Sequence, residues 1–178
     1  MAELQRLRES IDAIDGRLVG LLNERARLAQ EIGRIKERDG RPVYVHDRAE
    51  ELIRRLSAES AGPLGDSAIR SIYTEIMSAA LSLEKDMVVA CVGEPGGGSH
   101  FAARQQFGSS IRYGFLPDTR EVVEALRRGE AECGVIPGTA AEPPHLPEGS
   151  GLGILATIEI DHGSTKTFLV LGRIQAPA

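Results

Sequence analysis

Apolar residues recur at alternating intervals of three and four along the start of the chain. They are Leu4, Leu7, Ile11, Ile14, Leu18, Leu21, Leu28, Ile32 and Ile35. This heptad-like spacing predicts one continuous helix of about 36 residues that ends at the Asp39-Gly40 pair, just before Pro42. Such a helix is about 54 Å long, which exceeds the width of a domain of about 86 residues. We therefore expect a second copy of the chain to cover the apolar stripe, in an intertwined homodimer.

Two shorter helical segments follow in the first half of the chain. The second helix is predicted to begin near Asp47, and the Gly62-Pro63-Leu64-Gly65 run breaks the chain after it. A third helix is predicted next, with Asp66 or Ser67 as its N-cap. Its apolar positions are Ile69, Ile72, Tyr73, Ile76, Met77, Ala80, Leu81 and Leu83. Residues 1–86 are therefore expected to form an all-α domain of three helices.

The pattern changes near residue 87 to short apolar runs between turns. Residues 87–178 hold 14 of the 20 glycines and seven of the nine prolines, whereas 14 of the 21 basic residues precede them. The runs predict a βαβαβ unit followed by two more strands. Strands are expected at 87–92, 111–115, 132–136, 152–160 and 166–172, helices at 99–107 and 118–128, and connections at 93–98, 138–151 and 161–164. Residues 87–178 are thus expected to form a small α/β domain.

Composition and charge argue against several classes of protein. The chain has 178 residues, with 21 Lys and Arg against 26 Asp and Glu, and its net charge of −5 argues against a nucleic-acid binder with a broad basic face. Three Tyr, four Phe and no Trp leave little for a base-stacking platform. No apolar run reaches the roughly 18 residues of a membrane span, and the chain starts directly in a charged helical pattern. We expect a cytoplasmic protein without nucleic-acid or membrane partners.

Cysteine and histidine show no pattern typical of a metal or thiol centre. Cys91 and Cys133 lie in apolar runs and are expected to be small buried residues in a reducing compartment, with a disulfide or a catalytic thiol as the alternative. The histidines are His46, His100, His145 and His162. Because they lack metal-ligand spacing, we expect surface or loop positions for them and no metal site.

Two basic residues interrupt the apolar face of the long helix. Arg25 takes a position that the spacing reserves for Leu or Ile, and Lys36 follows 11 residues later. Eleven residues turn a helix by about 1100°, so both side chains share one face, about 16 Å apart along the axis. Arg48, near the start of the second helix, is placed to join them. The pattern favours a cationic, water-poor pocket for a small dianion. The alternative is that Arg25 only reaches to the surface or sets the register of a coiled coil.

Arg8 lies on the same helix, 17 residues before Arg25. The separation of about 25 Å is too long for both to reach one small ligand within one chain. In an intertwined dimer, Arg8 of one subunit approaches Arg25 of the other. We therefore expect a pocket that two subunits share.

The order and spacing of several short segments in the helical half are specific. They are Leu7-Arg8-Glu9-Ser10-Ile11-Asp12, Glu24-Arg25, Gly33-Arg34-Ile35-Lys36, Arg41-Pro42-Val43-Tyr44, Asp47-Arg48 and residues 72–84. Together they make residues 4–86 resemble the helical class of chorismate mutases. The resemblance implies a homodimeric isomerase that converts chorismate to prephenate in phenylalanine and tyrosine biosynthesis. That intramolecular Claisen rearrangement needs a fixed substrate conformer and stabilised charge, but no general base, covalent intermediate or cofactor.

The resemblance also implies a role for each site residue. Arg8 of the partner subunit, Arg25 and Arg48 would bind the substrate carboxylates, for which Arg is suited. Lys36 would reach the ether oxygen and a carboxylate. Glu84 would lie across from Lys36, on the same ether oxygen.

Two positions depart from the family pattern. Some members have Gln at the position of Glu84. A Glu donates a hydrogen bond to the ether oxygen only when it is protonated. The alternative for Glu84 is a solvated carboxylate in the last helical turn. Ala49 stands where the family usually has a Glu that binds the substrate hydroxyl. Glu50 is one residue along, about 100° around the helix. We expect this change to affect affinity more than the rearrangement.

The α/β half resembles prephenate dehydratase in residues 92–103, 133–137 and 165–172, but its catalytic motifs are replaced. The family's Thr-Arg-Phe appears here as Lys166-Thr167-Phe168, its Glu-Asn-Ser as Thr139-Ala140-Ala141, and its Gly-Thr-Phe as Gly96-Gly97-Gly98. A short connection, 138–151, stands where a second lobe would close the cleft. The glycine loop also lacks a P-loop ending and dinucleotide spacing, which disfavours a nucleotide site.

We expect residues 87–178 to be a truncated, non-catalytic lobe that is regulatory, oligomerising or a relic. Two alternatives to a monofunctional chorismate mutase stay open. One is a bifunctional chorismate mutase/prephenate dehydratase. The other is a non-catalytic helical interaction protein, in which Arg25 and Lys36 only tune a coiled-coil seam.

Overall fold

A helical region precedes a sheet region in the computed structural model, which describes residues 1–42, 44–161 and 165–174. The helical region has α1 (Ala2–Arg38), α2 (His46–Glu59) and α3 (Asp66–Glu84). The sheet region has β1 (Val88–Val92), α4 (Gly98–Phe107), β2 (Arg112–Leu116), α5 (Thr119–Arg128), β3 (Cys133–Pro137), β4 (Leu152–Asp161) and β5 (Thr165–Arg173). The expected order, helical and then α/β, is confirmed.

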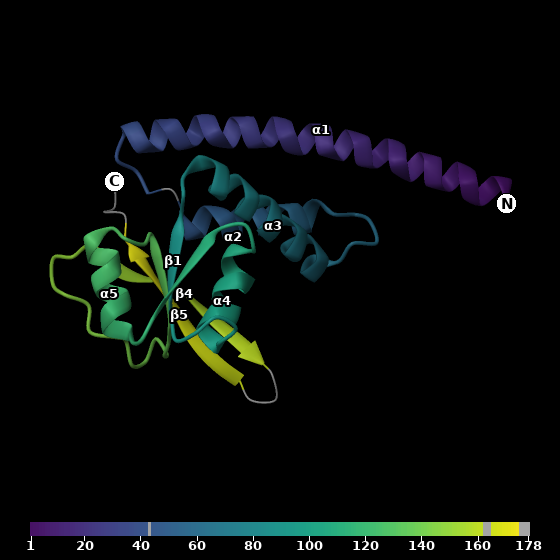
Figure 1. The fold of residues 1–178 in the computed structure, drawn as a ribbon. Coiled ribbons are helices and arrows are strands. Elements are labelled where there is room, and N and C mark those ends of the chain that lie inside the picture. Colours follow the sequence, from purple (N-terminus) through teal and green to yellow (C-terminus); the bar gives the residue numbers. More distant parts are fainter. Residues whose placement is uncertain (43, 162–164, 175–178) are drawn as a thin grey trace.

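The long helix α1 extends well beyond the rest of the chain (Figure 1). It has 37 residues and ends at Arg38, with Asp39 as its C-cap and Gly40 next at a φ of +64°. The first six apolar residues of its stripe, Leu4 to Leu21, are 46–62% exposed in the single chain. The stripe that the sequence predicts is therefore present and solvent-facing over the N-terminal half of α1.

The shorter helix α3 packs against the C-terminal half of α1, and α2 packs against α3 (Figure 1). The expectation that Asp66 or Ser67 caps α3 is wrong, because Asp66 is already helical and Gly65 is the N-cap. The Gly65 carbonyl accepts hydrogen bonds from the N–H groups of Ala68 and Ile69. Asp66 still places its charge in the first turn, where it complements the helix dipole.

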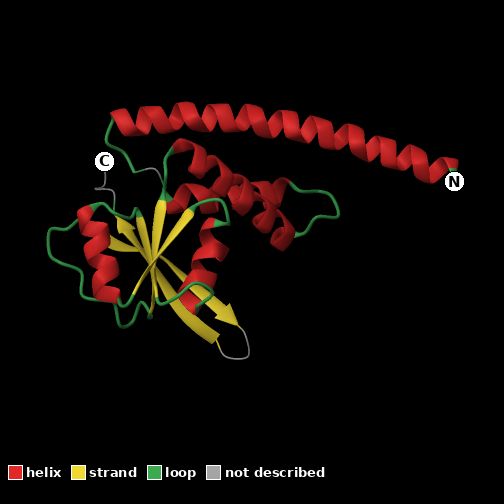
Figure 2. Cartoon of the chain, viewed as in Figure 1, coloured by secondary structure: helices red, strands yellow, loops and turns green. Residues whose placement is uncertain are grey.

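The sheet has the strand order β2-β1-β3-β5-β4. The pairs of β1 with β2 and with β3 are parallel, whereas β5 runs antiparallel to β3 and β4. The crossovers through α4 and α5 leave in opposite directions, since β2 and β3 flank β1. Right-handed crossovers in opposite directions place their helices on opposite faces. Figure 2 shows α4 and α5 on the two sides of the sheet.

Alternate residues of the central strand β1 face the two helices. Val89 and Cys91 belong to the core cluster that contains Phe107 of α4, whereas Ala90 belongs to the cluster that contains Leu126 of α5. Cys91 and Cys133 are both free and buried, as expected, so no disulfide joins them. Burial raises the pKa of each thiol to about 12, which opposes a reactive thiolate.

The histidines differ in part from the expected surface or loop positions. His46 is the half-buried first residue of α2, and its Nδ1 lies 3.3 Å from the hydroxyl of Tyr44. His100 lies in α4 with its ring edge against the aromatic rings of Tyr113 and Phe115. Tyr44 covers part of the His46 ring, and Tyr113 and Phe115 of β2 cover part of the His100 ring, so neither histidine is a fully exposed loop residue. His145 is exposed in a loop, as expected, and His162 lies with residues 163–164 outside the described residues.

Candidate functional site

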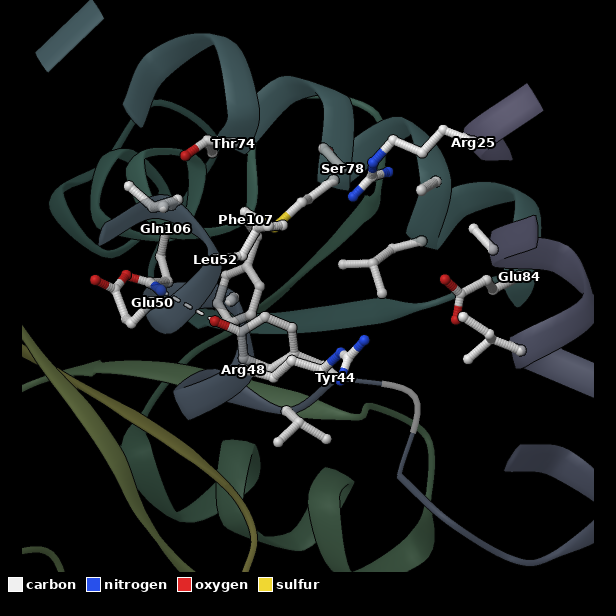
Figure 3. Close-up of a pocket in the computed structure, with 18 of the residues that line it drawn as sticks. Arg25, Tyr44, Arg48, Glu50, Leu52, Thr74, Ser78, Glu84, Gln106 and Phe107 are labelled. Carbon is white, nitrogen blue, oxygen red and sulfur yellow. Dashed lines mark hydrogen bonds between the residues drawn. The ribbon is translucent and has the colours of Figure 1, made fainter. Parts of the chain in front are cut away.

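A pocket of about 310 Å³ lies where α1, α2, α3 and the end of α4 meet. This volume is in the range of small-molecule sites. Its apolar lining includes Leu28, Ile32, Leu52, Met77 and Leu81. Polar and charged side chains enter from each of the surrounding helices (Figure 3).

Four cationic residues line this pocket, and one of them, Arg70 of α3, is paired with Glu50. Arg25 and Lys36 come from α1 and Arg48 from the first turn of α2. Figure 3 shows the guanidinium groups of Arg25 and Arg48 directed into the cavity. The structure thus brings together the three cations that the sequence singles out. Arg8 lies on the projecting N-terminal part of α1 and is not among the lining residues of this chain.

Glu84, the last residue of α3, lines the same pocket. Its Oε2 lies 3.8 Å from the Nζ of Lys36, and its side chain is 9% exposed. The alternative of a solvated carboxylate is therefore wrong for this chain. Burial raises the pKa of Glu84, and the charges of Lys36 and Arg25 oppose the shift. Among the described side chains, none donates a hydrogen bond to the buried Oε2.

Gly33 of α1 allows Glu84 to lie this close to the long helix. A Cβ atom at position 33 would be 3.0 Å from the Cβ and 3.1 Å from the Cγ of Glu84. Gly33 is buried within α1, where a glycine costs helix stability. The close approach of α3 explains why a glycine is tolerated there.

Glu50 and Ala49 line the pocket side by side on α2. Figure 3 places Glu50 at the opposite end of the cavity from Glu84. Both carboxylate oxygens of Glu50 accept hydrogen bonds from Arg70, at 2.9 and 2.8 Å. These bonds lower the pKa of Glu50 and hold it as a carboxylate. Glu50 is therefore an acceptor inside the pocket that is already paired.

Several lining residues had no assigned role in the sequence. Tyr44 and the buried Thr74 and Ser78 come from the helical region, whereas Gln106 and Phe107 come from the end of α4. Tyr44 belongs to a segment that the family resemblance uses, so a signal for it existed. Gln106 and Phe107 lie more than 60 residues after Tyr44, and no periodicity connects them to the helical region.

The arrangement suits a small, doubly negative, partly apolar ligand. Cationic side chains enter from three helices, apolar side chains exclude water, and one buried carboxyl group lies beside an ammonium group. Among the described residues, no cluster of three or more His, Cys, Asp or Glu side chains could hold a metal ion. No helix in the described ranges has the length and apolarity to cross a membrane.

Fold and site together define a helical region with a cationic small-molecule pocket, followed by an α/β region. A family model for "Chorismate mutase type II" matches residues 7–85. This helical region is therefore similar to the chorismate mutase type II family.

The sequence similarity to curated proteins covers more than the helical region. The "Bifunctional chorismate mutase/prephenate dehydratase" of Aquifex aeolicus is 41% identical over 141 residues, which are 77% of this chain and 39% of that protein. The protein of that name from Pseudomonas aeruginosa is 31% identical over 140 residues, 76% of this chain and 38% of that protein. The 141-residue match is longer than the helical region, so the similarity continues into the α/β region. The chain spans about two fifths of the length of these relatives.

A solved structure is also similar to part of the chain. The chorismate mutase (form II) of Thermus thermophilus is 43% identical, and the match covers 46% of this chain and 93% of that chain with a TM-score of 0.45.

Proposed function

We propose that this protein is a chorismate mutase, an isomerase that converts chorismate to prephenate in the biosynthesis of phenylalanine and tyrosine. The observation that carries the proposal is the convergence of Arg25, Lys36 and Arg48 with Glu84 in one pocket of the helical region. Chorismate carries two carboxylates on a small carbon frame, which matches the charge and size of this pocket. We assign residues 1–86 to the mutase domain and residues 87–178 to a second, α/β domain.

The reaction is an intramolecular rearrangement, so the protein supplies geometry and charge. Arg25 and Arg48 bind the two carboxylates and hold the enolpyruvyl group over the ring, in the chair conformer that reacts. Lys36 donates to the ether oxygen, where negative charge grows as the carbon–oxygen bond breaks. No group of the protein forms a covalent bond, and the chemistry calls for no cofactor.

Glu84 acts as a second donor to the ether oxygen in its protonated form. Its burial favours that form, although Lys36 opposes it. No described side chain donates a hydrogen bond to its Oε2. This oxygen is therefore available to share a proton with the substrate. Gln, which some family members have at this position, also has a donor group that can reach the ether oxygen.

The decisive experiment follows the loss of chorismate by absorbance. Lys36→Ala is expected to lower kcat/KM by roughly three orders of magnitude, because it removes the charge at the ether oxygen. Arg38→Ala is the matched control, since Arg38 is a basic residue of the same helix whose exposed side chain pairs with Asp39. A wild-type protein that leaves chorismate unchanged would identify a non-catalytic helical interaction protein instead.

We propose that the α/β domain does not catalyse the dehydratase reaction. Lys166-Thr167-Phe168 and Gly96-Gly97-Gly98 stand where the catalytic motifs of that family would be. The ring of Phe168 also occupies the space beside the glycine loop, where a Cβ on Gly98 would be 2.7 Å from it. The same reaction mixture, followed for phenylpyruvate, is expected to stop at prephenate; phenylpyruvate would show a bifunctional enzyme.

A further inference from the structure

We propose that the corner between α4 and β2, residues 106–110, supports one wall of the mutase pocket, and that Gln106, which lines the pocket, is a positioning residue for Arg48. This inference deepens the proposed function and rests on it for its catalytic consequence. The α/β domain then takes part in the mutase site and is not an inert attachment. Its contribution is structural, because none of its charged groups lines the pocket among the described residues.

The amide of Gln106 joins the α/β domain to the start of α2. Its Nε2 donates to the hydroxyl of Tyr44 at 3.0 Å and lies 3.3 Å from Nδ1 of His46. Tyr44 and His46 also approach each other at 3.3 Å. One amide group therefore holds two residues at the entrance of α2. Arg48 follows only two residues later, in the first turn.

Aromatic packing supports the same contact. The rings of Tyr44 and Phe107 lie 4.8 Å apart between centroids, tilted by 58°. Phe107 is 2% exposed and belongs to the main core cluster of the sheet region, against which Tyr44 also packs. Burial raises the pKa of Tyr44, so its hydroxyl stays neutral and hydrogen-bonded. Tyr44, two residues before α2, is thus anchored in the core of the sheet region.

The same corner also binds α3, the opposite wall of the pocket. The backbone N–H and hydroxyl of Ser109 both donate to Oε2 of Glu75, at 3.0 and 2.7 Å. The N–H of Ser110 donates to the hydroxyl of Ser78, a pocket-lining residue that is fully buried. Gly108 makes this approach possible, because its φ is +75° and a Cβ there would be 2.6 Å from the Cβ of Ser78.

Residues 106–110 therefore hold α2 and α3 at a set separation. Arg48 lies on one of these helices and Glu84 at the end of the other. Loss of the Gln106 contacts leaves the first turn of α2 free to move, which misdirects Arg48. Since Arg48 binds a carboxylate in both ground and transition states, the effect falls mainly on KM.

The test compares Gln106→Ala, Tyr44→Phe and the double variant with Arg104→Ala, an exposed position on the same helix. Gln106→Ala is expected to raise KM for chorismate about 10-fold with kcat changed less than about threefold, while Arg104→Ala changes neither. The double variant is expected to raise KM no more than the single substitution with the larger effect, because both substitutions break the same hydrogen-bond network. If the effects of Gln106→Ala and Tyr44→Phe on KM were fully additive, or if Gln106→Ala lowered kcat alone, the positioning role would be overturned.

Amide hydrogen exchange of the ligand-free protein separates this inference from the proposed activity. Residues 46–50 are expected to exchange about 10-fold faster in Gln106→Ala than in wild type or Arg104→Ala, while α5 keeps its protection. Unchanged exchange at 46–50 would overturn the positioning role even in an active enzyme. If the wild-type protein had no mutase activity, the proposed function would be overturned. Faster exchange at 46–50 in Gln106→Ala would in that case still establish the contact between Gln106 and the start of α2.

Discussion

At the residue scale, the protonation of Glu84 is the main chemical variable of the candidate site. A carboxylate at this position repels the developing negative charge on an ether oxygen, whereas a carboxylic acid donates a proton to it. The side chain is 9% exposed and 3.8 Å from Lys36. Burial raises the pKa of Glu84, and the ammonium group acts in the opposite sense.

The pH dependence of the reaction follows from this raised pKa. Lower pH increases the protonated fraction of Glu84, so kcat/KM is expected to rise as pH falls from neutral and to fall as pH rises through the pKa. Glu84→Gln, which keeps a donor at every pH, is expected to flatten the profile. Chorismate loss measured between about pH 5 and 8 tests both proteins. A flat wild-type profile over mildly acidic to neutral pH would contradict this role.

At the element scale, the approach of α3 to α1 sets the distance between Glu84 and Lys36. Gly33 is the point of contact, and an added Cβ there requires Glu84 to shift by a few tenths of an ångström. Alanine is also a better helix residue than glycine by about 0.5–1 kcal/mol. Crowding and helix propensity therefore act in opposite directions on stability, but only crowding acts on the site.

Gly33→Ala is accordingly expected to change the free energy of unfolding by less than about 1 kcal/mol while lowering kcat about 10-fold. Gly16→Ala is the control, since a Cβ at Gly16 meets nothing within 4 Å in this chain. Urea unfolding and chorismate kinetics on both variants give the comparison. Equal kinetics for Gly33→Ala and wild type would show that the α1–α3 distance is not critical.

At the scale of the whole molecule, the N-terminal half of α1 exposes an apolar stripe with no cover in the single chain. We propose that a second copy covers it in a homodimer and that Arg8 of the partner subunit completes each site. A helix of 37 residues is long enough to span both pockets of such a dimer.

Mixing two inactive variants tests this shared site. Arg8→Ala and Arg25→Ala are each expected to be inactive alone. In an equal mixture, half of the dimers are heterodimers with one intact site, so about a quarter of wild-type activity is expected to return. Subunits refolded together and assayed for chorismate loss give the measurement. No recovery, with dimers confirmed by mass, would indicate that each site belongs to one chain.

The features that could be predicted from the sequence are those that depend on the spacing of neighbouring residues. Helical periodicity placed α1, α2 and α3, and the turn residues around short apolar runs placed the five strands, because both signals depend on neighbouring positions. The shared face of Arg25 and Lys36 follows from the helical repeat alone, and both line the pocket. The cap of α3 escaped prediction because Gly65, Asp66 and Ser67 are all plausible caps.

Contacts between distant segments needed the tertiary structure. The burial of Glu84 depends on how closely α3 approaches Gly33, and helix periodicity contains no such distance. The contacts of Gln106 with Tyr44 and His46 cross about 60 residues of chain and depend on the way α4 packs on the sheet. The sequence by itself therefore determined the elements and the cationic face of α1. Only the tertiary structure decided how deeply Glu84 is buried beside Lys36 and which residues of the α/β region line the pocket, because burial arises from packing between elements.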